Sequence, residues 1–302
     1  MTLIDTIFLV IVNFVWGMNF LAAKWAVADF PPMVVNAIRF AIVTVLLLPF
    51  LKPVRGRMKD LFIAAFVLGV LHFGLIFIAM SFAEGVSAMA IVSQLNVPFA
   101  TILAIVILKE QVGWKRVSGI AVSFLGVLVL GFDPAVFEYV DAVVFMAAAA
   151  FVYALSTILM RQLKDVKAVT TQAWVGLFGC VGSVFLSLIF EVGQVEAIST
   201  AGSLAWGAVV YSAIMSSIVG HGGLNYLLRK YEVSHIAPYF VLTPLFAIGG
   251  GIFILDEVLT DRMMIGGTLT IVGVAIVTLR NSRRGSKELK TVQRVGKKFG
   301  EQ

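Results

Sequence analysis

Residues 85–108 form an uninterrupted uncharged stretch, GVSAMAIVSQLNVPFATILAIVIL. Its 24 residues exceed the roughly 20 that an α-helix needs to cross the hydrocarbon core of a bilayer. The rest of the chain is of the same kind, because 60% of all residues are hydrophobic and 13% are charged, with a mean hydropathy of +1.00. The sequence therefore predicts an integral membrane protein rather than a soluble domain.

Apolar runs separated by short charged or proline-containing breaks predict ten membrane-spanning helices. Open sheets cannot span lipid because their edge groups would go unpaired there, and the runs lack the alternation of a barrel strand. The predicted fold class is therefore an all-α integral membrane protein with ten transmembrane helices. The expected spans are residues 4–24, 32–51, 60–81, 86–108, 114–132, 141–160, 169–190, 203–228, 234–255 and 263–280.

Basic residues predict which loops face the cytoplasm. Twenty of the 23 Lys and Arg residues lie in the C-terminal tail and in the loops after predicted helices 2, 4, 6 and 8. Because positively charged loops stay in the cytoplasm, both termini are expected there. The N-terminus has no basic start and no cleavage site, so it is predicted to be a retained span. The expected location is a bacterial-type plasma membrane.

Charge and cysteine content restrict the partners. The net charge of +6 lies wholly in the tail from Arg280 onward, and we interpret the tail as a segment attracted to anionic lipid headgroups. Cys180 is the single cysteine, which excludes an intrachain disulfide and a cysteine metal cluster. The expected partners are the bilayer and a small-molecule substrate, with no nucleic acid, cofactor or metal. Monomer and homodimer are both left open.

An internal repeat runs through the chain at an offset of 147 residues. Because a unit of five helices is odd, the second copy enters the membrane upside down. This inversion explains why ILKEQVGWKRVSG at 107–119 becomes ILDEVLTDRMMIG at 254–266, with its charges nearly reversed. We predict a first unit at 1–136, an inverted second unit at 137–281 and a basic cytoplasmic tail at 282–302. The aligned pairs include Val86–Ser87 with Val233–Ser234, Glu110 with Glu257, Gly119 with Gly266, and Gly126 with Gly273.

Several short motifs together resemble the EamA-type branch of the drug/metabolite transporter superfamily. The resemblance covers nearly the whole chain and implies ten helices in two inverted units around a central cavity. It also implies export of amino acids or related metabolites, as in amino-acid exporters of the YddG type. The chain departs from the family's Leu-Gly-Glu at Lys109 and Asp256. The matching residues are Trp16-Gly17, Asn19-Phe20, Lys24, Pro32, Arg39-Phe40, Pro98, Glu110, Gly119, Gly126, Pro244, Glu257, Gly266 and Gly273.

Arg39, His72 and His221 are ionisable residues predicted to lie within spans, and His72 is the histidine nearest to mid-span depth. Arg39 lies about 10 Å inside the second helix at 1.5 Å per residue, where its guanidinium is able to anchor a substrate carboxylate. Alternatively it snorkels to the outer interface or pairs with Asp29. His72 is a candidate for proton relay or for stacking on a substrate, and the alternative is a packing role. His221 lies among glycines, which favours close helix packing.

Aromatic and small polar residues recur at matching places in the first helix of each unit. An offset of 137 sets Trp16 against Tyr153 and Asn19 against Ser156. Such pairs are able to line a cavity near a pseudo-twofold axis. Packing against core or lipid is the alternative interpretation.

Pro98 and Pro244 predict interruptions or hinges in helices 4 and 9. Paired interrupted helices are typical of transporter substrate sites, so Gln94, Tyr239 and Thr243 are candidate cavity residues. Simple tolerance of proline in membrane helices is the alternative. In helices 5 and 10, small residues at helical spacing predict a packing seam.

The predicted function is a secondary transporter that exports amino acids or related metabolites by alternating access. The alternative is a proton-coupled exporter of cationic or lipophilic drugs. The acidic residues all fall at span ends, in loops or in the tail, which disfavours a proton antiporter driven by a central carboxylate. An enzyme is not expected, because the sequence has no HExxH and no paired intramembrane carboxylates.

Overall fold

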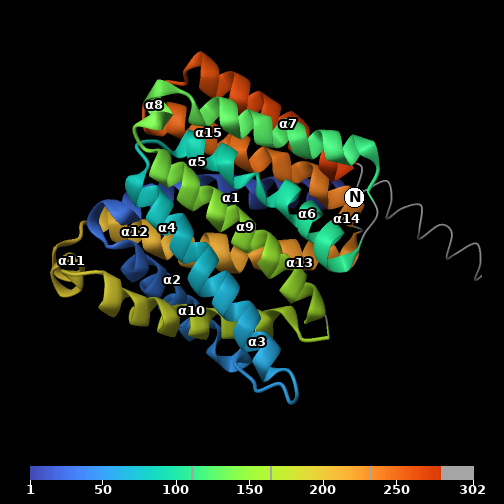
Figure 1. Ribbon diagram of the computed structural model, residues 1–302. Helices are drawn as coiled ribbons and strands as arrows, with labels where there is room; N and C mark the ends of the chain where they lie inside the picture. Colours follow the sequence, from blue (N-terminus) through green and yellow to red (C-terminus); the bar gives the residue numbers. More distant parts are fainter. Residues whose placement is uncertain (110–111, 164, 232, 280–302) are drawn as a thin grey trace, which may run out of the picture.

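The computed structural model describes residues 1–109, 112–163, 165–231 and 233–279. Every regular element in these residues is helical (Figure 1). A last helix is Asp261–Leu279. The other elements are α1 (Leu3–Asp29), α2 (Pro32–Leu47), η1 (Leu48–Phe50), α3 (Met58–Ala65), η2 (Phe66–His72), α4 (Phe73–Phe82), α5 (Val86–Ser93), α6 (Asn96–Leu108), α7 (Trp114–Gly131), α8 (Pro134–Phe137), α9 (Val140–Gln162), α10 (Ala168–Phe190), α11 (Gln194–Thr200), α12 (Ser203–Tyr211), η3 (Ser212–Gly220), α13 (His221–Lys230), α14 (Val233–Ile236), η4 (Ala237–Val241) and α15 (Leu242–Ile254).

Nine helical stretches within the described residues are long and apolar enough to cross a membrane. A further apolar stretch, Tyr239–Ile254, is shorter, because the predicted ninth span is divided into α14, η4 and α15. The predicted second span also ends early as an α-helix, at Leu47, and continues as a 3₁₀ turn. The short helices α8 and α11 were missed because they lie in connections without a long apolar run.

The two ends of the bundle are named here by the predicted orientation. The inner end carries Met1 and is predicted to face the cytoplasm, whereas the outer end carries α8 and α11, at the left of Figure 1. Packing partners cross between the two halves of the sequence. Helix α1 packs against α12, η3 and α15, and α9 packs against α4, α5 and α6. Each half therefore supplies its first helix to the other half.

The fourth predicted span, residues 86–108, is broken at Gln94–Leu95, between α5 and α6. Pro98 has no N–H to return to the carbonyl four residues earlier, and the Gln94 carbonyl instead accepts from Val97 N–H at 3.2 Å. Pro244 is likewise the third residue of its helix, α15, and follows the 3₁₀ turn η4. Both breaks thus lie before the proline rather than at it.

Two π-helical segments lie at corresponding places in the third and eighth predicted spans, residues 60–81 and 203–228. Segment η2 covers Phe66–His72 and η3 covers Ser212–Gly220. Adding the repeat offset of 147 to η2 gives residues 213–219, which lie inside η3. A π-helix is rare and often marks a functional site, so these segments direct attention to the side chains that contact them. Their sequences carry no signal that would have predicted them.

The predicted small-residue seam joins α7 to the last helix, and these two lie side by side in Figure 1. A Cβ on Gly126 would lie 2.4 Å from the Thr270 hydroxyl oxygen and 2.5 Å from the Gly266 carbonyl oxygen. A Cβ on Gly273 would lie 2.4 Å from the Ser123 backbone nitrogen. Glycine is therefore required for the helices to approach this closely, which confirms the seam.

Lys109 and Asp256 occupy left-handed backbone at equivalent helix ends, with φ of 55° and 54°. A left-handed residue after a helix lets the following N–H turn back to satisfy a terminal carbonyl. Accordingly, Glu257 N–H donates to the Gly251 carbonyl at 3.0 Å. Glycine suits this backbone because it lacks a Cβ. This geometry accounts for the glycine of Leu-Gly-Glu in the family pattern. Glu110, the repeat mate of Glu257, lies outside the described residues.

Candidate functional site

One group of candidate residues lies where α1 meets η3 and α13. The Trp16 indole N–H donates to the Ser216 carbonyl at 3.2 Å. Its ring centroid lies 5.2 Å from that of His221 and 6.0 Å from that of Phe240. One turn along α1, Asn19 Oδ1 accepts from the Ser212 hydroxyl at 2.6 Å. Gly220 and Gly223 contact Trp16 and α1 closely, in keeping with the packing role expected around His221.

A second group of candidate residues lies where η2 and α4 meet α9. His72 Nδ1 lies 2.9 Å from the Ala149 carbonyl oxygen. The His72 ring centroid lies 4.8 Å from the Tyr153 ring and 4.7 Å from the Phe73 ring. Ser156 uses its hydroxyl locally, donating to the Tyr153 carbonyl at 2.7 Å. The aligned pairs predicted for helices 1 and 6 thus belong to two different clusters.

Arg39 joins these two groups. Its guanidinium carbon lies 4.1 Å from the Phe73 ring centroid, and its Nε and Nη2 donate to the Ser217 hydroxyl oxygen at 3.1 and 3.0 Å. The side chain has no exposed surface, so it does not snorkel to the outer interface. The ion pairs of the described residues do not include Arg39 with Asp29, and the Asp29 carboxylate accepts from Gly202 N–H at 2.8 Å.

The remaining candidates are dispersed. Thr243 donates its hydroxyl to Asn13 Oδ1 at 2.8 Å, joining α15 to α1. Gln94 is buried at the break between α5 and α6. Tyr239 packs against a separate inner-end cluster with Leu9 and Ile236. Of these three residues, Tyr239 lies nearest to the first group, because its cluster also contains Phe240, the ring neighbour of Trp16.

The sequence did not predict a polar clamp at the outer end. Lys24 Nζ donates to the Ala83 carbonyl, where α4 ends, and the Glu257 carboxylate accepts from Val86 N–H and from Ser87 N–H at 3.1 Å, where α5 begins. A cation at a helix C-terminus and an anion at a helix N-terminus both complement the helix dipole. We call these five residues the outer clamp.

The outer clamp has closely fitted walls and acidic neighbours. A Cβ on Gly85 or Gly251 would lie 2.8 or 2.6 Å from a Glu257 carboxylate oxygen. Burial, followed by nearby carboxylates including that of Glu257, raises the pKa of Tyr139 to about 12. The Tyr139 hydroxyl is therefore protonated at neutral pH. One feature of the sequence marks these positions. Val86–Ser87 and Glu257 both have matching residues in the other repeat unit at the offset of 147.

Polar ties at the inner end have a different character. The Asp5 carboxylate accepts from Lys230 Nζ at 2.7 Å, joining α1 to α13. Arg57 pairs with Asp165 at 2.9 Å, joining the loop before α3 to the connection after α9, and this carboxylate raises the pKa of Arg57. The Asp5 tie joins two helices of the group around α1, and the Arg57 tie joins two segments of the group around α9. The outer clamp instead joins one group to the other, because it connects α1 and the end of α15 to the corner between α4 and α5.

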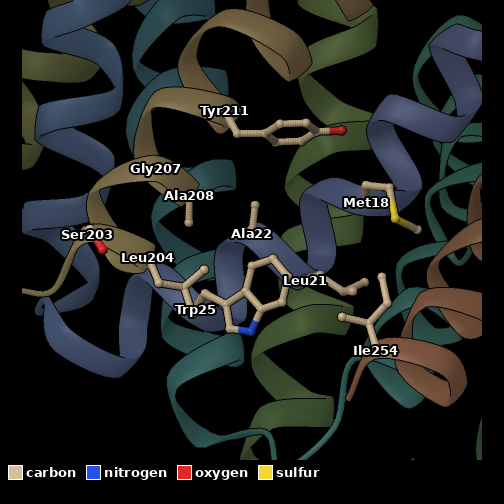
Figure 2. Close-up of a pocket in the computed structure, with 10 residues that line it drawn as sticks. All are labelled: Met18, Leu21, Ala22, Trp25, Ser203, Leu204, Gly207, Ala208, Tyr211 and Ile254. Carbon is tan, nitrogen blue, oxygen red and sulfur yellow. The ribbon is translucent and has the colours of Figure 1, made fainter. Parts of the chain in front are cut away.

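A pocket of about 370 Å³ lies between α1, α12 and the end of α15 (Figure 2). Its lining side chains are apolar apart from the hydroxyls of Ser203 and Tyr211 and the indole N–H of Trp25, and the Tyr211 hydroxyl donates to the Val15 carbonyl at 3.1 Å. None of the predicted site residues lines it. A zwitterion needs charged or hydrogen-bonding partners, so this pocket does not suit one.

Comparison with known proteins identifies the family. The model of the EamA-like transporter family matches residues 4–132 and 141–279. The chain belongs to the EamA-like transporter family. A probable amino-acid metabolite efflux pump of Escherichia coli is 26% identical over 280 residues, covering 90% of this chain and 94% of that protein. An uncharacterized transporter of Archaeoglobus fulgidus is 28% identical over 270 residues, covering 87% and 94%.

Further similarities agree with membership of the EamA-like family. A probable terminal-alkyne amino-acid exporter of Streptantibioticus cattleyicolor is 26% identical over 190 residues, covering 62% of each chain. A solved crystal structure superposes with a TM-score of 0.64 at 19% identity, covering 93% of this chain and 98% of that one, and so shares the fold. The EamA-like chain is therefore a multi-pass inner-membrane transporter and not an enzyme.

Proposed function

We propose that this EamA-like transporter exports amino acids or related small metabolites by alternating access, using ten helices in two inverted five-helix units. The family match over nearly the whole chain carries the proposal, since named relatives include an amino-acid metabolite efflux pump and an amino-acid exporter. Corresponding π-segments and left-handed helix ends support the inverted duplication. The basic loops support cytoplasmic termini.

The distribution of contacts supports a state that is closed at the outer end. The outer clamp crosses between helix groups, whereas the inner-end ties of Asp5 and Arg57 stay within groups. Helix α5 packs against α15 and α1 as well as α9, whereas the next segment inward, α6, packs chiefly on α9 and α7. In an alternating-access cycle, the clamp is the part that must open to release substrate outside.

Reconstitution into proteoliposomes tests this function. The measurement is efflux and exchange of a panel of radiolabelled amino acids, with protein-free liposomes as the control. We expect saturable transport with trans-stimulation, because a carrier binds its substrate on each side in turn. Movement of lipophilic cations but of no amino acid would contradict the proposal. Coupled proton flux that is lost in His72→Ala would instead favour the drug-exporter alternative.

A further inference from the structure

The apolar pocket between α1, α12 and the end of α15 borders the outside of the bundle (Figure 2). Two of its lining residues, Leu204 and Ile254, are 59% and 52% exposed. Phe253, which precedes Ile254, is 86% exposed. Large apolar side chains that are exposed on membrane-spanning helices contact lipid, whose chains are as apolar as leucine. The pocket is therefore next to the acyl chains of the bilayer.

The pocket also lies at the depth of the lipid chains of one leaflet. Its residues on α1 run from Met18 to Trp25, and α1 ends at Asp29. At 1.5 Å per residue, the pocket extends from about 6 Å to about 17 Å below that end of the helix. One leaflet contributes about 15 Å of hydrocarbon, which is half the thickness of the bilayer core. An acyl chain that enters between α1 and α12 would therefore run along the whole pocket.

The chemistry of the pocket wall suits a hydrocarbon chain. Leucine, isoleucine, methionine and alanine side chains form most of the wall, and an apolar cavity of this kind does not hold water. Its volume of about 370 Å³ lies within the range of about 300–1,000 Å³ that is typical of small-molecule sites. Gly207 contributes to the open space, because a Cβ there would meet no atom within 4 Å.

Two unused hydrogen-bond donors lie at the outer rim of the pocket. Ser203 is the first residue of α12, and Trp25 is the pocket residue nearest to the outer end of α1. In Figure 2 the Trp25 indole nitrogen lies on the side of the ring away from Tyr211. Among the described residues, neither side chain has a hydrogen-bond partner. A tryptophan N–H at this depth is typical of the membrane interface, where ester and phosphate oxygens of lipids accept hydrogen bonds.

A carboxylate stands beside this rim. Asp29 accepts from the backbone N–H of Gly202 at 2.8 Å, and Gly202 directly precedes Ser203. The one basic residue of α1, Lys24, instead donates to the Ala83 carbonyl in the outer clamp. The rim is therefore negative, and it favours a headgroup that carries an ammonium over a headgroup that is anionic overall.

We propose that this pocket binds one acyl chain of a phosphatidylethanolamine-type lipid. The lipid's ester and phosphate oxygens accept from Ser203 and Trp25, and its ammonium group lies beside Asp29. The chain fills a gap between three helices and so adds packing contacts that the protein alone lacks. The predicted substrate-site residues do not line the pocket, so the lipid site does not depend on the transport function.

The test is lipid binding to purified, delipidated full-length protein in detergent, measured by native mass spectrometry. The probes are phosphatidylethanolamine, phosphatidylglycerol and phosphatidylcholine with identical acyl chains. We expect one phosphatidylethanolamine to bind at least about tenfold more tightly than phosphatidylglycerol, because only its ammonium donates a hydrogen bond to a charged acceptor. Phosphatidylcholine, whose quaternary ammonium has no N–H, should bind with intermediate affinity. Phosphatidylethanolamine should also raise the melting temperature more than phosphatidylglycerol does.

Three variants separate the parts of the site. Gly207→Phe fills the pocket and should abolish lipid binding. Asp29→Asn keeps an oxygen for Gly202 N–H but removes the charge, so it should bind phosphatidylethanolamine and phosphatidylglycerol equally. Ser203→Ala removes one neutral donor and should lower the affinity for all three lipids by about two- to tenfold. Gly222→Phe is the matched control, because Gly222 is likewise an exposed helical glycine whose Cβ would meet nothing within 4 Å, and it should bind lipid as wild type does.

Fluorescence quenching provides a second measurement that does not need Gly207→Phe to fold. Phosphatidylethanolamine with brominated chains is titrated into phosphatidylglycerol liposomes that contain the protein. We expect a saturable component of tryptophan quenching that is lost in Trp25→Phe. The component should persist in Trp114→Phe, which removes a tryptophan that is 74% exposed and lies on α7.

Equal affinity for the three lipids would show unselective contact with the bilayer and would overturn the proposal. Unchanged binding of phosphatidylethanolamine to Gly207→Phe would overturn it too, as would a saturable quenching component that survives Trp25→Phe. If lipid binding follows the expected pattern but proteoliposomes move no amino acid, the transport function fails and the lipid site stands.

Discussion

Glu257→Gln is expected to loosen the outer clamp. The substitution keeps the size of the side chain but removes the negative charge opposite the start of α5, and it turns one acceptor into a donor that faces a backbone N–H. A hydrogen bond to a charged group contributes about 1.5–3 kcal/mol, against about 0.5–1.5 kcal/mol for a neutral one. A charge at a helix N-terminus adds about 0.3–1 kcal/mol. The expected loss is therefore about 1.5–3 kcal/mol.

A cysteine placed within the clamp, at Ser87, reports this loss. Cys180 is the single cysteine, so Cys180→Ala gives a clean background for Ser87→Cys. Ser87 is 2% exposed, and its hydroxyl has no hydrogen-bond partner, so sulfur replaces it with little change. If labelling by a polar maleimide requires the clamp to open, 1.5–3 kcal/mol corresponds to a rate about 10 to 150 times faster. Purified protein in detergent is suitable because both ends are accessible to the reagent.

Asp256→Asn is the matched control for this experiment. It removes a negative charge from the adjacent, exposed residue, whose side chain is not part of the clamp. Labelling in this control should stay within about twofold of the parent, since an isolated surface charge contributes less than about 0.5 kcal/mol. Labelling of the Glu257→Gln protein at the parent rate would refute the clamp. Equal acceleration in the Glu257→Gln and Asp256→Asn proteins would refute it as well, because it would show a general effect of charge.

Three other outcomes are expected. Lys109→Gly should raise the free energy of unfolding by about 1 kcal/mol, because glycine adopts left-handed backbone without strain. Asp256→Gly should raise it by less, because aspartate tolerates left-handed backbone better than lysine does. Thermal unfolding of each variant measures the change in stability. Gly126→Ala should lower stability by about 1–3 kcal/mol through overpacking, whereas Gly131→Ala, which meets nothing within 4 Å, should be nearly neutral. Halves expressed separately should fail to fold stably, and co-expression should restore transport.

The sequence predicted the parts of the fold that depend on hydrophobicity and residue size. Apolar runs located nine helices of spanning length in the described residues to within a few residues, and small residues at helical spacing located the seam at Gly126 and Gly273. The breaks in helices 4 and 9 were expected from Pro98 and Pro244. The sequence did not predict their places, because the missing N–H disturbs the preceding turn rather than the proline itself.

The candidate site was harder to predict because it depends on long-range contacts. Trp16 and Tyr153 were paired by the repeat, yet each packs with a different set of helices. Glu257 is near Lys24 and the start of α5 only in three dimensions. The π-segments leave no mark in the sequence, so the position of Arg39 beside Ser217 of η3 could not be predicted either. These failures have one cause, which is that helix periodicity describes faces and not neighbours.

The exchange of first helices indicates which bodies move in the proposed cycle. Because α1 packs with α12 and α15, and α9 packs with α4, α5 and α6, a moving body contains helices from both halves of the sequence. The inner-end ties at Asp5 and Arg57 lie within these bodies and survive a rocking motion, whereas the outer clamp lies between them. Arg39 also spans the division, since it contacts Phe73 in one body and Ser217 in the other. A substrate carboxylate that replaces the Ser217 contact would release one body from the other at mid-depth. Binding at Arg39 and opening of the clamp are therefore expected to be coupled.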